Sequence, residues 1–196
     1  MRTGPPPWSE ALLRLFLRPD VFASVSGDLL EQYRDSIHPT RGMRGADFWY
    51  LTQVLGFVWR GSRQWAALFA GAFVARTALD WLRPTTDFLV RSEVSTSLAA
   101  GVLLAAGFWT AWRSGSFAAG AVAGLATTAF GALLSITDTT VLLAIWHDPH
   151  TMTSISGSGG LEEALALPVW LILPGVVIGG VGGFAGATAH RLASAA

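Results

Sequence analysis

After Arg63 the chain is mostly apolar, and four of its apolar segments are long enough to cross a membrane. A helix needs about 20 apolar residues to span ~30 Å of hydrocarbon. The segments cover about residues 64–82, 95–112, 117–137 and 168–189. The chain is 52% hydrophobic and only 13% charged, whereas soluble domains carry about 25% charged residues. We therefore predict an all-α integral membrane protein whose residues 64–196 form a four-helix transmembrane bundle.

Residues 1–63 differ in character, because they contain eight arginines and six acidic residues. Apolar residues in three- and four-residue steps predict helices over about 10–17, 20–37 and 45–60, with Ser9 as the first N-cap. The buried stripe of the second helix is predicted to comprise Phe22, Val25, Leu29, Tyr33 and Ile37. One face of the third helix should carry Phe48, Leu51, Leu55 and Val58. We expect a short cytoplasmic helical module whose last helix rests on the membrane surface.

The arginines also predict the orientation. With the N-terminus in the cytoplasm, ten arginines fall on the cytoplasmic side and only Arg83 and Arg91 on the other. Cytoplasmic loops of membrane proteins carry such an excess of positive charge. Both termini are therefore predicted to be cytoplasmic.

Three charged residues fall within or beside the apolar segments. Arg76 and Asp80 lie one helical turn apart in the first segment, and Asp138 lies near the end of the third. A charge inside a membrane helix is costly and marks a candidate functional site. Arg76 and Asp80 either neutralise each other near the outer interface or belong to a transport or proton path. Asp138 is either solvated at the surface or paired with Arg76.

Glycines recur every four residues in the third and fourth segments. The candidate packing residues are Gly120, Gly124, Gly175, Gly179 and Gly183. Small residues at this spacing let membrane helices approach closely. They either pack the bundle internally or form a face for a second copy or a membrane partner. Pro174 is predicted to interrupt the fourth helix, because it lacks a backbone N–H.

Between the third and fourth segments, His147-Asp148-Pro149-His150 precedes a run rich in serine and glycine over residues 154–160. We predict a flexible external loop there, followed by a short surface helix over residues 161–167. The sequence predicts no metal site and no cofactor, and the chain has no cysteine. It shows no paired carboxylates or Ser-His-Asp arrangement, so an enzyme is not predicted. The weakly basic first module does not indicate nucleic-acid binding.

Two motifs in the first module carry a resemblance to a known family. They are Gly27-Asp28-Leu29-Leu30-Glu31-Gln32-Tyr33-Arg34 and, after a short gap, Phe48-Trp49-Tyr50-Leu51-Thr52-Gln53-Val54-Leu55. Over about residues 8–60 the chain resembles the bacterial permease prefix domain, with Gln32 in place of the family's usual second acid. In that family the domain precedes permease subunits of ATP-driven transporters of the macrolide-exporter and lipoprotein-release type. The remaining chain is too short for such a permease.

The resemblance implies a multi-pass protein of the bacterial inner membrane. We expect an accessory or regulatory protein whose cytoplasmic module docks a protein partner, in relation to a transporter system. The candidate docking residues are Asp28, Glu31, Tyr33 and Arg34. One alternative is a small oligomeric transporter or channel that uses Arg76, Asp80 and Asp138. Another is a membrane-bound signalling protein that holds a cytoplasmic regulator.

Overall fold

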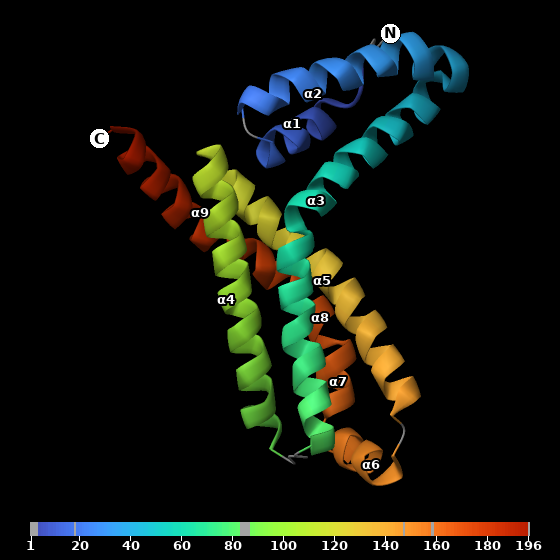
Figure 1. Cartoon of the computed structure of the whole chain (residues 1–196), viewed down its shortest axis with the longest axis vertical. Helices are drawn as coiled ribbons and strands as arrows, with labels where there is room; N and C mark the ends of the chain where they lie inside the picture. Colours follow the sequence, from blue (N-terminus) through green and yellow to red (C-terminus); the bar gives the residue numbers. More distant parts are fainter. Residues whose placement is uncertain (1–3, 18, 83–86, 147, 158, 196) are drawn as a thin grey trace.

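A computed structural model describes the whole chain except residues 1–3, 18, 83–86, 147, 158 and 196 (Figure 1). All regular secondary structure in the described residues is helical. The helices are α1 (Pro7–Phe16), α2 (Pro19–Gln32), the π-helix η1 (Tyr33–Ile37), α3 (His38–Leu82), α4 (Phe88–Ser114), α5 (Phe117–Ile145), α6 (Pro149–Gly157), α7 (Gly160–Leu165), α8 (Leu167–Trp170) and α9 (Ile172–Ala195). Helices α1 and α2 pack beside the first half of α3. The second half of α3 and the helices that follow it form the bundle.

The first helices follow the predicted apolar pattern. In α2 and η1, Leu29 and Tyr33 are buried, and the other three residues of the predicted stripe are half-buried. The predicted N-cap at Ser9 is wrong, because α1 already begins at Pro7. Proline suits a first helical position, where its missing N–H would have had no partner. The Ser9 hydroxyl instead donates a 2.6 Å hydrogen bond to the Pro6 carbonyl oxygen.

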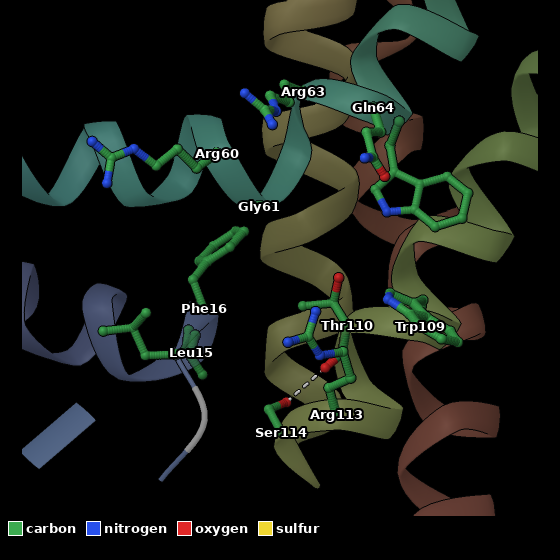
Figure 2. A pocket seen from close by; sticks show the side chains of 12 residues that line it. Leu15, Phe16, Arg60, Gly61, Arg63, Gln64, Trp109, Thr110, Arg113 and Ser114 are labelled. Carbon is green, nitrogen blue, oxygen red and sulfur yellow. Dashed lines mark hydrogen bonds between the residues drawn. The ribbon is translucent and has the colours of Figure 1, made fainter. Parts of the chain in front are cut away.

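Helix α3 joins the polar and apolar parts of the chain without a break. Its only non-helical residue is Gly42, with φ +66° and ψ 176°, a conformation that glycine adopts readily. The predicted end of the second helix near residues 38–42 therefore corresponds to a sharp turn at Gly42. The predicted boundary after Arg63 falls within continuous helix. Figure 1 shows α3 changing direction about midway, and Figure 2 places Gly61 and Arg63 at this bend, where a Gly61-Ser62 pair is a usual cause of a kink.

Of the face predicted for the first half of α3, only Val58 is buried. The buried row is Ala46, Tyr50, Val54 and Val58, while Phe48 is 69% and Leu55 43% exposed. Aromatic and aliphatic residues occur on every face of this helix, so hydrophobicity alone did not identify the packed one. The contact with Leu13, Leu29 and Tyr33 of the preceding helices decides it.

Two tyrosines form the centre of this first core. The Tyr33 hydroxyl donates a 2.8 Å hydrogen bond to Asp47 Oδ1. The Tyr33 ring meets the Tyr50 ring edge-on, with centroids 6.1 Å apart, a favourable geometry for aromatic pairs. Burial raises the pKa of the Tyr50 phenol, and the nearby Glu10 carboxylate raises it further. Both rings therefore tie α3 to η1 as packed side chains.

Three helices in the described part of the chain are long and apolar enough to cross a membrane. They cover Ser92–Ser114, Phe117–Ile145 and Ile172–Ala195. The predicted first span, residues 64–82, is fully helical but is not among them, since Gln64, Arg76 and Asp80 lower its hydropathy. Helix α5 continues without interruption to Ile145.

The connection between α5 and α9 is more ordered than predicted. The described part of residues 154–160 is not a flexible loop, because α6 runs to Gly157 and buries Ile155. The predicted surface helix over residues 161–167 is present as α7, but it is not a surface helix. Glu163 and Ala164 of α7 are buried, because α7 packs against α3, α4 and α5.

The bundle is centred on α9, which lies against both α4 and α5. A Cβ atom on Gly179 would lie 2.7 Å from the Gly120 carbonyl oxygen and 2.7 Å from Gly124 Cα. On the other side of α9, Gly182 and Gly186 lie against the α4 backbone. All five glycines named from the sequence are buried at the α5–α9 crossing. The helix is interrupted at Leu171, and α9 begins at the next residue. Pro174 follows within one turn. Because proline has no backbone N–H, it cannot donate the helical hydrogen bond to the Trp170 carbonyl oxygen.

Replacing Gly179 with alanine should destabilise the bundle by about 1–3 kcal/mol, the usual effect of overpacking. The obstructing atoms are backbone and cannot rotate away. The matched control is Gly101→Ala in α4, where a Cβ would meet nothing within 4 Å. We expect a lower thermal midpoint for G179A in detergent and an unchanged or slightly higher one for G101A. Equal midpoints for both variants would contradict the backbone contact.

Candidate functional sites

The first candidate site is an acidic surface on α2 and η1. Asp28, Glu31 and Asp35 follow three- and four-residue steps, so they share one helix face. All three are exposed, and with Gln32 and Ser36 they line a hollow of about 380 Å³. The π-helical turn widens the backbone where this hollow lies, and such turns often occur at functional sites. Sequence reasoning identified Asp28 and Glu31 but missed Asp35, although its spacing was visible.

Tyr33 does not belong to this surface, which corrects its place among the docking candidates. Its side chain is only 1% exposed and bonds to Asp47. A docked partner could not contact it without disrupting the core. Arg34 is exposed beside the acidic face, so it remains available at the edge of the surface.

Of the three charged residues named from the sequence, Arg76 and Asp138 differ in their burial. Arg76 is half-buried on α3, and Asp138 is exposed on α5. The side chain of Asp80 lies outside the described residues. Thr137 and Thr140 beside Asp138 bond back to the carbonyl oxygens of Leu133 and Ile136. Asp138 thus lies on the outer side of α5 rather than facing the neighbouring helices.

A buried carboxylate that sequence reasoning missed lies inside the bundle instead. Glu163 of α7 is 4% exposed and accepts a hydrogen bond from the Ser95 hydroxyl of α4, which is fully buried. Thr77 of α3 and Thr139 of α5 are buried as well. At 1.5 Å per residue, Thr77, Ser95 and Thr139 each lie about 8–11 Å from the end of their own helix. Buried polar side chains therefore occur near one end of each of these three helices.

Two buried hydroxyl groups of α5 differ from the usual hydrogen-bonding pattern of such helices. Ser and Thr in membrane helices commonly bond back to the carbonyl one turn earlier, as Thr128 does to Gly124. The buried hydroxyls of Ser135 and Thr139 have no hydrogen-bond partner in the described part of the chain. The Glu163–Ser95 hydrogen bond joins α7 to α4.

The sequence signal for Glu163 was weak. Glu162 and Glu163 are adjacent, and only the second is buried. Gly159 starts the helix in a left-handed conformation, with φ +72°, and Gly160 and Ala164 are small enough for α7 to enter between larger helices. A six-residue helix shows too few turns for its buried face to be recognised from periodicity.

No group of three potential metal ligands occurs among the described residues. Asp148 and His150 are exposed, and His147 lies outside the described residues. Comparison with known proteins found no matching family model, no similar curated protein and no similar solved structure.

Replacing Glu163 with alanine should lower stability by about 1–3 kcal/mol, because it removes the buried hydrogen bond between Ser95 and Glu163 that joins α4 to α7. Glu163→Gln keeps an acceptor oxygen and should have a smaller effect. The control is Glu162→Ala, since this neighbour is exposed. Thermal unfolding of the three variants in detergent measures the difference. The buried pair would be contradicted if E162A were as destabilising as E163A.

Proposed function

We propose that the chain is a multi-pass membrane accessory or regulatory protein that docks a protein partner through its first helices. The acidic surface of α2 and η1 carries this proposal. The largest buried side chains of this unit form its own core, whereas Asp28, Glu31 and Asp35 stay exposed around one hollow. The partner surface that fits is therefore a basic helix or loop.

The proposed topology has four spans, with both termini in the cytoplasm of a bacterium. The arginine distribution supports it. The second half of α3, the proposed first span, buries Phe69 and Phe73 against Ala99 and Leu103 of α4. The N-terminal helices and the C-terminus lie at the same end of the bundle in Figure 1, as an even number of spans requires.

Reporter fusions at Gly157 and at the C-terminus should distinguish four spans from three. With the N-terminus cytoplasmic, four spans place Gly157 outside and the C-terminus inside. Three spans, without residues 64–82, reverse both positions. We expect an alkaline phosphatase fused after Gly157 to be active and one at the C-terminus to be inactive. A cytoplasmic signal at Gly157 would overturn the four-span topology.

The resemblance of residues 8–60 to permease prefix domains favours a partner from a transporter system. The acidic hollow is consistent with either such a partner or a soluble regulator, so the chemical identity of the captured protein distinguishes accessory from signalling roles. The exposed position of Asp138 does not favour the transporter alternative.

A photo-crosslinking amino acid at Gln32, inside the hollow, should form a discrete adduct in intact membranes. The same amino acid at Thr52, exposed on α3, serves as the positional control. The triple change D28N/E31Q/D35N should reduce the Gln32 adduct at least tenfold, because it removes the attraction for a basic partner.

The variant control is Arg41→Gln, an exposed charge of the same unit, which should leave the adduct unchanged. An adduct of equal yield from Thr52, or one that persists in the triple variant, would refute docking at this surface. A transporter subunit in the adduct supports the accessory role, and a transcription regulator supports the signalling role.

A further inference from the structure

A second surface lies at the membrane-facing side of the N-terminal helices and carries the opposite charge. It is a cavity of about 500 Å³ between the end of α1, the bend of α3 and the last turns of α4 (Figure 2). Gly61 makes the bend close to α1, because a Cβ there would lie 3.0 Å from the Phe16 ring.

The described lining contains three arginines, Arg60, Arg63 and Arg113, and no acidic residue. Arg60 stacks on the Phe57 ring at 5.5 Å and extends along α3 away from Gly61 in Figure 2. Arg63 and Arg113 come from different helices and are both exposed. The carboxyl end of α4 contributes a partial charge of about −0.5, which is less than the positive charge of the two guanidinium groups. The cavity therefore suits an anion.

Polar side chains and tryptophans surround the same space. Gln64 and Thr110 line it, and Trp65 and Trp109 close the side toward the bundle. Tryptophan prefers the boundary between hydrocarbon and headgroups, so these two rings place the arginines at headgroup level. An arginine fork binds phosphate oxygens with well-directed hydrogen bonds.

An apolar groove continues from these tryptophans along the bundle. Trp65 and Trp109 also line a second hollow of about 500 Å³ between α4 and α9, together with Leu104, Phe108 and Val181. Gly101 lies in this groove with open space around its Cα. A cationic cavity joined to an apolar groove matches a molecule with a phosphate at one end and a hydrocarbon chain at the other.

We propose that this composite surface binds one anionic phospholipid, with its headgroup phosphate at Arg63 and Arg113 and an acyl chain in the α4–α9 groove. Basic pockets at the cytoplasmic ends of membrane helices bind such headgroups in general. The bound lipid would bridge α1, α3 and α4 and so hold the N-terminal helices against the bundle. This goes beyond partner docking and depends only on the protein lying in a membrane.

The test measures lipid binding to the purified full chain in detergent, by native mass spectrometry and by the shift in thermal midpoint. Phosphatidylglycerol is compared with phosphatidylcholine, which has no net charge, and with inorganic phosphate. We expect phosphatidylglycerol to bind and stabilise most. R63Q/R113Q should weaken its binding roughly tenfold or more, since each arginine near a headgroup contributes about fivefold, while R41Q/R44Q, two exposed arginines on the other part of α3, should not.

A groove variant separates a lipid from a free anion. Gly101→Leu adds a side chain where a Cβ would meet nothing within 4 Å, and it should weaken phosphatidylglycerol binding while leaving any phosphate effect unchanged. Unchanged thermal midpoints of all variants in phosphatidylcholine establish that they are folded. Equal binding of the two lipids, full binding by R63Q/R113Q, or a phosphate shift as large as that of phosphatidylglycerol would overturn the proposal. None of these outcomes depends on the crosslink at Gln32. The lipid-binding proposal and the partner-docking proposal can therefore be refuted independently of each other.

Discussion

The bundle depends on backbone contact between glycines of α9 and the helices on either side of it. Within a bilayer the lipid chains are as apolar as the side chains, so hydrophobic burial does not drive helices together. Close packing must supply the attraction instead, and it is strongest where no side chain separates the backbones. Gly179 meets Gly120 and Gly124 on one side, and Gly182 and Gly186 meet α4 on the other. The positions of α4 and α5, and thus of every site on them, follow from these contacts.

The second constraint is that α3 runs from the N-terminal helices into the bundle as one helix. The bend at Gly61 divides α3 into two segments that pack against different helices. The first segment packs on Leu13, Leu29 and Tyr33, and the second on α4 and α5. After the turn at Gly42, the N-terminal part of α3 is joined to the bundle by helical backbone rather than by a loop.

This arrangement places acidic and basic side chains on different surfaces. The acidic face of α2 and η1 is exposed, while Arg63 and Arg113 line the cavity between α1, α3 and α4. A basic partner and an anionic lipid would thus bind the same unit at different surfaces. The buried Glu163–Ser95 pair at the far end of the helices closes the bundle there. Charged groups occur at both ends of the bundle, while its middle is packed by glycine, alanine and phenylalanine.

The sequence by itself determined the helical class, the long apolar segments and the four-residue glycine rows, because length and periodicity are local properties of a chain. It also placed the polar face of the second helix, since Asp28 and Glu31 follow helical spacing whatever lies opposite. Tertiary structure decided which face of an all-round apolar helix is buried, as Phe48 and Leu55 were exposed and Ala46 and Tyr50 packed. It also buried Glu163 on a helix too short to show a pattern, and brought Arg63 and Arg113 to one cavity. Those outcomes depend on contacts between helices that are distant in sequence. The free energy of such contacts depends on both helices, so it cannot be inferred from the residues of one segment alone.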